Sequence, residues 1–166
     1  MAAAMLGDRL ATRRAALSVT SAGLVSADTP PPDEVIAAMA DLGLDLSTHR
    51  SRPVTPEVIS AAALVLTMTR QQLVDVTVLA PRAWSRCFTL GDLLRRGEVV
   101  GPREDGQSLA VWVQRAHAGR SRIGLLSLDP ADDVADPMGG RLQVYRRSRD
   151  ELAGLTDRLA ALLAPV

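Results

Sequence analysis

Apolar residues recur at offsets of three and four along several stretches of the chain, which is typical of amphipathic helices. The chain opens on such a stretch, which ends near Arg13 and whose apolar face is formed by Met1, Met5, Leu6 and Leu10. No cap residue and no turn precede it, so the backbone N–H groups at its start have no side-chain partner nearby in the sequence. The pattern predicts a helix that begins at the first residue.

Three segments have the pattern of strands instead. In residues 17–22, Leu17 and Val19 alternate with polar residues, which is the period of a half-buried strand. The run AALVLTM at 62–68 is continuously apolar, as in a strand buried on both faces. RCFTL at 86–90 predicts a third, shorter strand.

Start and stop signals place the other helices. Prolines before Asp33 and Glu34 predict the first turn of a helix that Gly43 ends, and Thr55 with Pro56 predicts a short helix. Further helices are predicted after the capping-box pair Thr69 and Gln72, over LGDLLRR at 90–96, around Leu109–Ala116 and over Leu152–Leu162.

Strands and helices alternate, so we expect an α/β fold with a small parallel sheet of three or four strands and helices on both faces. The 166 residues fit one domain, residues 1–166. The first helix has no strand before it, although a helix that crosses over between parallel strands needs one at each end. We therefore expect a βα unit whose first strand is missing from the chain.

Composition excludes several classes of protein. Nineteen basic residues, all arginine, balance nineteen acidic ones, which gives no charge excess for a nucleic acid or a membrane surface. The longest apolar run is too short to span a bilayer, and no signal peptide is evident, so we expect a cytoplasmic protein. The single cysteine, Cys87, excludes an internal disulfide and a cysteine-rich metal site, and no cofactor or metal is predicted.

Several short stretches, taken in order, carry a family resemblance. They are MAAAML at 1–6, SAG at 21–23, STHRSRPVT at 47–55, LVLTMT at 64–69, FTL at 88–90 and DDVADPMGG at 132–140. Together they resemble the low-molecular-weight protein tyrosine phosphatases, especially the actinobacterial type, over essentially the whole chain. The resemblance implies a first strand and a phosphate loop, C-x-x-x-x-x-R-S-P, ahead of Met1. The chain is then an N-terminally truncated member that lacks the nucleophilic cysteine and the phosphate-binding arginine.

In this family a thiolate at a helix N-terminus attacks the phosphate, and an acid on a separate loop protonates the departing oxygen. The resemblance assigns that acid role to Asp136, in the Asp-Pro pair. It makes Ser21 and His49 a hydrogen-bonding pair that supports the phosphate loop. Met138 and Leu24 occupy places where members that favour phosphotyrosine have aromatic residues, so they form an aliphatic wall and phosphotyrosine specificity stays open.

Other residues have structural interpretations. We expect Asp132 and Asp133 to be solvated loop charges, and Arg50 and Arg52 to make surface or loop contacts. Cys87 has no arginine six positions later, so it is interpreted as a small buried residue of a strand. His117 is expected at the surface, and the packing residues are expected to be Trp84, Trp112 and Tyr145.

Three functions remain open. The first is a phosphate monoester hydrolase that acts on a phosphorylated protein or a small aryl phosphate when the upstream loop is present. The second is an inactive remnant or interaction module of the same fold. The third is an arsenate reductase, whose chemistry relays a disulfide through two further cysteines downstream of the nucleophile, whereas this chain offers only Cys87. Neither the oligomeric state nor the natural substrate follows from the sequence.

Overall fold

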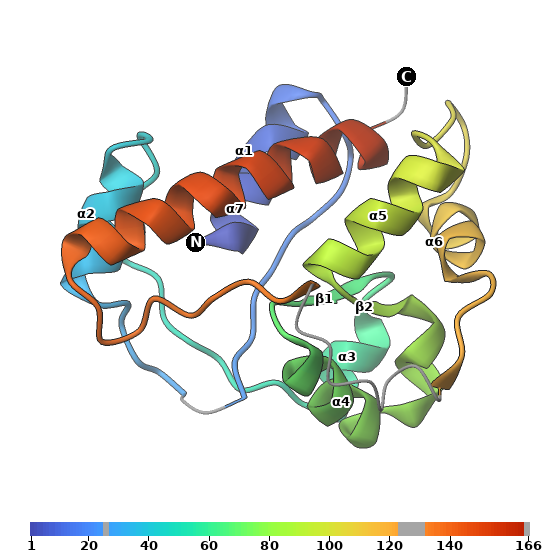
Figure 1. The fold of residues 1–166 in the computed structure, drawn as a ribbon, viewed down its shortest axis with the longest axis horizontal. Helices are drawn as coiled ribbons and strands as arrows, with labels where there is room; N and C mark the ends of the chain where they lie inside the picture. The colour runs from blue at the N-terminus through green and yellow to red at the C-terminus, as the bar shows by residue number, and fades with distance from the viewer. Residues whose placement is uncertain (25–26, 123–131, 165–166) are drawn as a thin grey trace. The chain divides into compact units, whose positions relative to one another are not determined.

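The structure is a computed structural model that describes residues 1–24, 27–122 and 132–164 (Figure 1). It divides into two compact units, the first formed by residues 1–54 and 135–160 and the second by residues 55–134 and 161–166. The helices and strands, in chain order, are α1 (Ala2–Thr12), α2 (Asp33–Ala40), α3 (Pro56–Ala61), β1 (Val65–Thr67), α4 (Arg70–Leu79), the 3-10 helix η1 (Pro81–Arg86), β2 (Cys87–Thr89), α5 (Leu90–Val100), α6 (Leu109–His117) and α7 (Leu142–Leu163).

The first unit is built on α1, α2 and most of α7. The predicted apolar face of α1 is confirmed, since Met5, Leu6 and Leu10 are buried, and Met1 at its N-cap makes no side-chain cap hydrogen bond. Ion pairs join the helices of this unit. Arg13 of the turn after α1 lies 3.1 Å from Asp157 of α7. Asp41, which follows α2, accepts hydrogen bonds from two arginines of α7.

The segment after α1 keeps the predicted alternation but does not form the predicted strand. Leu17 and Val19 are half-buried, whereas Ser18 and Thr20 are exposed. Within the described residues, the only bridge of this segment is an isolated parallel one between Gly23 and Pro53. The expectation of a strand over residues 17–22 is therefore wrong. The alternation of apolar and polar residues determines which side chains are buried. A β-strand also needs a second strand whose backbone hydrogen-bonds to its own, and the alternation does not supply one.

The second unit contains a small parallel sheet, formed by β1 and β2 side by side (Figure 1). Val65 pairs with Cys87, and Thr67 pairs with Thr89. All three residues of β2 are buried. The α/β class with a small parallel sheet is confirmed, but the described residues form two strands in place of the expected three or four.

Side-chain caps begin the α-helices α3, α4, α5 and α6 of this second unit, and the caps of α3 and α4 lie where the sequence predicts them. Thr55 accepts a hydrogen bond at the start of α3, and Thr69 with Gln72 forms the predicted capping box of α4. Thr89 and Ser108 cap α5 and α6 in the same way. Each cap satisfies a backbone N–H that has no partner inside its helix.

Close packing joins α5 to α6 and to the end of α7. At Gly97 of α5, an added Cβ would lie 2.9 Å from the Leu162 side chain and 3.0 Å from the Trp112 ring. The Trp112 indole N–H donates to the carbonyl of Gly101 at 2.9 Å. Among the described helices, none combines the length and the apolar character needed to cross a membrane.

Candidate active site

Asp136 lies at the surface in a tight turn of the first unit. Its Oδ1 accepts the backbone N–H of Met138 at 2.9 Å. The N–H of Gly140 then donates to the carbonyl of Pro137, also at 2.9 Å. Pro137 fixes its own backbone angle, and Gly139 has φ of +77°, which favours glycine. The sequence DPMGG therefore builds a defined turn that presents one carboxyl group to solvent.

The turn packs against the start of α7. An added Cβ at Gly140 would lie 2.9 Å from the Pro137 carbonyl oxygen and 2.9 Å from the Val144 Cβ. The hydroxyl of Tyr145, a buried residue of α7, donates to the Met138 sulfur at 3.8 Å. The start of α7 therefore contacts the turn at Gly140 and at Met138, although the sequence predicted only a packing role for Tyr145.

Ser21 lies in a segment that hydrogen-bonds to the segment around Arg52. Arg52 Nε donates to the Ser21 carbonyl and Nη2 donates to the Thr20 hydroxyl, each at 2.8 Å. Backbone bonds at Gly23 extend the contact, because its N–H donates to the Arg52 carbonyl and its own carbonyl accepts from Val54. The expected loop contact of Arg52 is confirmed, and it fixes the backbone of Ser21.

His49 lies in an exposed turn of the same unit. Its N–H donates to the Leu46 carbonyl at 3.0 Å, and its carbonyl accepts from the Arg50 guanidinium at 2.7 Å. Two hydrogen bonds from Ser47 lower the pKa of Asp45, which stabilises the turn that precedes His49. Within the described part of the chain, the side chains of Ser21 and His49 do not bond to each other. Their pairing around a phosphate loop stays a prediction.

Leu24 and Met138 are both exposed, with 42% and 69% of their surface accessible. Large aliphatic side chains at such exposure offer apolar surface to a ligand. Both belong to the same unit as Ser21, His49 and Asp136, so the five predicted site residues fall in one compact part of the fold. The pocket-wall role of Leu24 and Met138 stays a prediction.

The expectation that Asp132 and Asp133 are solvated loop charges is wrong. Their hydrogen bonds to Arg70 and Arg95 were not predicted from the sequence. Asp133 Oδ1 accepts the backbone N–H of Arg70 at 2.7 Å, and Asp132 Oδ2 accepts from the side chains of Arg70 and Arg95. These aspartates are paired within the second unit and are not solvated charges. A signal did exist, since the first turn of α4 has no acidic residue and so leaves its positive end open to an anion from elsewhere. Residues 123–131, which precede them, lie outside the described residues.

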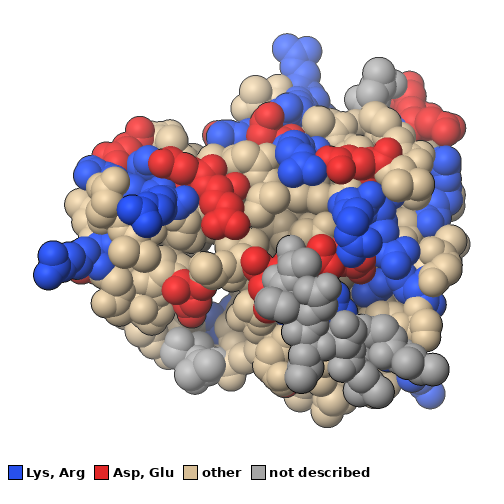
Figure 2. Space-filling model, viewed as in Figure 1, with Lys and Arg blue, Asp and Glu red and all other residues tan. Residues whose placement is uncertain are grey.

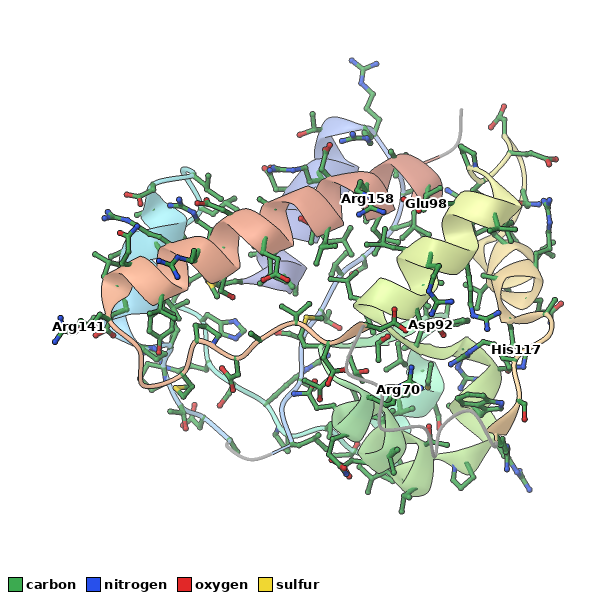
Figure 3. The ribbon with its side chains drawn as sticks, in the orientation of Figure 1. Arg70, Asp92, Glu98, His117, Arg141 and Arg158 are labelled. Atoms are coloured by element: carbon green, nitrogen blue, oxygen red, sulfur yellow. The ribbon has the colours of Figure 1, made fainter. Side chains whose placement is uncertain are left out.

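Asp92 of α5 gathers a network of arginines in the second unit. Its carboxylate accepts from Arg95 at 3.0 Å and from Arg96 at 2.8 Å, and it pairs with Arg120 at 3.2 Å. Figure 3 labels Arg70, Asp92 and His117, which lie on α4, α5 and α6 in this part of the unit. Figure 2 shows acidic and basic side chains next to one another on the face in view.

Arg120 is stacked between aromatic rings. Its Cζ lies 4.0 Å from the centre of the Trp84 ring and 3.9 Å from that of Phe88, and its side chain is only 4% exposed. Burial lowers the pKa of Arg120 to about 10, while Asp92 opposes the shift. His117 is half-buried beside these rings, which corrects its expected place at the surface. Burial and the neighbouring Arg120 lower the pKa of its imidazole.

Cys87 cannot act as the nucleophile. It is fully buried in β2, and burial raises the pKa of its thiol to about 11, so the reactive thiolate is scarce at neutral pH. Among the described residues, no group of three or more His, Cys, Asp or Glu side chains has the arrangement needed to hold a metal ion.

Comparisons with known proteins identify the class to which this fold and site belong. Residues 1–109 match the family model of the low molecular weight phosphotyrosine protein phosphatases. A protein-arginine-phosphatase of Geobacillus stearothermophilus is 30% identical over 98% of this chain and 86% of its own length. A low molecular weight protein-tyrosine-phosphatase of Escherichia coli K12 is 29% identical over 61% of this chain and 70% of its own length.

Solved structures agree in fold. An arginine phosphatase from G. stearothermophilus superposes with a TM-score of 0.66 at 26% identity, covering 95% of this chain and 82% of that one. The solution structure of a low molecular weight protein tyrosine phosphatase from Bacillus subtilis gives the same score and identity, covering 96% and 85%. The chain belongs to the low molecular weight phosphotyrosine protein phosphatase family, which confirms the family expected from its sequence, while the actinobacterial type stays a prediction.

Proposed function

We propose that the protein is a phosphatase in which Asp136 is the general acid. The observation that carries this proposal is the Asp136 turn, which presents an exposed carboxyl group on a backbone fixed by hydrogen bonds at Met138 and Gly140. A proton donor must meet the departing atom at the surface, where substrate enters. Family membership supplies a reaction that needs such a donor.

The proposed reaction has two steps. A cysteine thiolate attacks phosphorus. The bond from phosphorus to the leaving atom breaks, and Asp136 gives its proton to that atom, which is the oxygen of a phosphate ester or the nitrogen of a phosphoarginine. The Asp136 carboxylate then takes a proton from the water that releases phosphate from the cysteine. Because Cys87 is buried and has a raised pKa, we place the attacking cysteine in a phosphate loop encoded ahead of Met1.

This assignment is tested by expressing the chain together with its upstream reading frame and measuring hydrolysis of phenyl phosphate. Asp136→Asn keeps the acceptor oxygen for the Met138 N–H but cannot supply the proton. We expect kcat to fall on the order of 100- to 10,000-fold. The matched control is Asp105→Asn, another exposed aspartate that bonds to its own turn. Equal activity of the two variants would remove Asp136 from the reaction.

The substrate class is proposed to be a phosphorylated protein, with phosphotyrosine and phosphoarginine as the two candidates. Phosphotyrosine follows from the family, whereas phosphoarginine is favoured by the relative that matches 98% of the chain. Exposed aliphatic Leu24 and Met138 pack on either a flat ring or the methylene chain of arginine. Peptides that carry one or the other phosphoresidue separate the two candidates by their kcat/KM.

The alternative function is an interaction module without hydrolase activity, and it makes a different prediction. Such a module needs no phosphate site, so inorganic phosphate would leave its melting temperature unchanged even with the upstream segment present. A phosphatase is stabilised by phosphate because the ligand binds only the folded state.

A further inference from the structure

The residues just before the Asp136 turn, 132–134, belong to the second unit and bond to the start of α4 in that unit. The Asp133 carboxylate accepts the backbone N–H of Arg70 at 2.7 Å. The N–H of Val134 donates to the carbonyl of Met68 at 2.8 Å. These bonds join consecutive residues of the loop to residues on both sides of Thr69, the N-cap of α4, so the loop and the helix start are fixed to each other.

A second attachment holds Asp132. Its Oδ2 accepts from Arg95 of α5 at 2.8 Å and from Arg70 at 3.4 Å, and its side chain is only 13% exposed. The hydrogen bond that Arg95 donates to Asp132 raises the pKa of the Arg95 guanidinium. Arg95 also contacts Asp92, which links the loop to the arginine network. Charge-assisted hydrogen bonds of this kind are stronger than bonds between neutral groups.

A third attachment is steric. At Gly91 of α5, an added Cβ would lie 2.9 Å from both the Cα and the carbonyl oxygen of Asp132. Real Cβ atoms do not approach backbone atoms so closely, so the loop occupies the space that the missing side chain leaves. Gly91 is therefore required here for close approach of two backbones.

We infer that Asp132, Asp133 and Val134 form a loop anchor that positions Asp136, an inference that rests on its proposed role as the acid. Val134 precedes Asp136 by two residues, which limits their Cα separation to about 7 Å. A general acid must lie within hydrogen-bond reach of the departing atom, and a misplacement of about 1 Å lowers a rate by as much as 100-fold. Asp132, Asp133, Arg70 and Gly91 are thus positioning residues, which do not touch the substrate.

Two variants release the loop anchor by unrelated means. Asp133→Ala removes the acceptor of the Arg70 N–H, and Gly91→Ala pushes on the Asp132 backbone without changing a charge. Asp105→Ala and Gly154→Ala are the matched controls, since the Asp105 carboxylate accepts the N–H of the adjacent Gly106 and a Cβ at Gly154 meets no described atom within 4 Å. Asp133→Asn keeps an acceptor oxygen and serves as the rescue variant.

The first readout is made on the 166-residue chain and needs no activity. We expect amide exchange at Val134 to accelerate on the order of tenfold in Asp133→Ala and Gly91→Ala. The 15N order parameters of Asp136 and Met138 should fall in both variants, stay unchanged in the controls and recover in Asp133→Asn. Unchanged order at Asp136 and Met138 while Val134 exchanges faster would overturn the inference, and so would unchanged exchange at Val134.

The second readout is made on the form that carries the upstream segment. We expect both variants to lower kcat on phenyl phosphate by about 10- to 100-fold with little change in KM. They should leave 2,4-dinitrophenyl phosphate nearly unaffected, because its leaving group departs without a proton. Equal losses on the two substrates would indicate general structural damage and overturn the inference. If the unaltered protein hydrolyses neither substrate, the proposed function fails, and the order parameters alone decide whether the anchor positions the turn.

Discussion

At the scale of single residues, Asp92 shows how this arginine-rich chain stabilises a buried positive charge, that of Arg120. Its carboxylate meets Arg95, Arg96 and Arg120, and only the last of these is almost fully buried. Two aromatic rings cover the faces of the Arg120 guanidinium, while Asp92 contacts its Nε. A buried cation is tolerated when charge and hydrogen bonds compensate the water it has lost.

Removing that carboxylate should therefore be costly. We expect Asp92→Ala to lower the free energy of unfolding by about 3–5 kcal/mol, because Arg120 stays buried without its partner. Urea denaturation followed by circular dichroism measures the change. Asp150→Ala, at an exposed pair with Arg149, should cost at most about 1 kcal/mol. Similar losses in the two variants would contradict the account of the network.

Cys87 gives a second prediction at this scale. Since burial raises the pKa of its thiol to about 11, roughly one molecule in a thousand carries the thiolate at pH 8. Ellman's reagent should not label the native protein at that pH within minutes, but should label it fully in denaturing urea. Rapid labelling of the native protein would show that Cys87 is accessible and would reopen its interpretation as a reactive residue.

The helices follow local sequence signals closely, and the remaining elements do not. The capping box at Thr69 and the stop at Gly43, where φ is +73°, could both be predicted, because each depends on residues within one helical turn. The alternation of apolar and polar residues around Leu17 could not show whether a strand forms there, since a strand also needs hydrogen bonds to the backbone of a segment distant in the sequence. The same holds for Asp133, whose partner Arg70 lies 63 residues away.

Of the candidate site, the Asp136 turn was predictable because Asp, Pro and Gly act on their own backbone. The contacts that hold the turn were not, since Tyr145 reaches Met138 only once α7 has formed. Ser21 was proposed for its hydroxyl, yet the structure bonds its carbonyl to Arg52.

At the scale of elements, substituting two helical glycines, Gly97 of α5 and Gly154 of α7, tests how closely each helix packs against its neighbours. We expect Gly97→Ala in α5 to destabilise the protein by about 1–3 kcal/mol, because its methyl group meets Leu162 and Trp112 at 3.0 Å or less. Gly154→Ala in α7 should instead stabilise by about 0.5–1 kcal/mol, since its methyl group meets nothing and alanine favours the helix. Thermal melts of both variants measure the difference, and shifts of the same sign would contradict the packing described for α5.

Asp41 gives a prediction on pH at the same scale. Hydrogen bonds from Arg146 and then Arg149 lower its pKa in the folded protein. A carboxyl whose folded pKa is lowered stabilises the fold above its unfolded pKa, and this stabilisation is lost as the pH falls through the folded value. Melting temperatures measured below about pH 4 should therefore fall less steeply in Asp41→Asn than in the unaltered protein. If the melting temperatures of the two proteins fall equally steeply with pH, these ion pairs do not stabilise the contact between α2 and α7.

At the scale of the whole molecule, the chain forms two compact units, and each contains a different set of the residues in our proposals. The first unit contains all five predicted site residues, including Asp136 and the exposed Met138. The second contains the sheet, the arginine network and the residues we assign to the loop anchor. Asp136 lies two residues beyond the anchor along the chain, just past the boundary between the two units at residues 134 and 135.

The central claim is that Asp136 donates the proton to the leaving group, and the dependence of kcat on the acidity of that group tests it most directly. The measurement uses a series of aryl phosphates from dinitrophenyl to unsubstituted phenyl, with the protein carrying the phosphate loop that we propose ahead of Met1. The account predicts a nearly flat dependence for the unaltered protein and a steep loss toward phenyl phosphate for Asp136→Asn. Parallel dependences in the two proteins would contradict it.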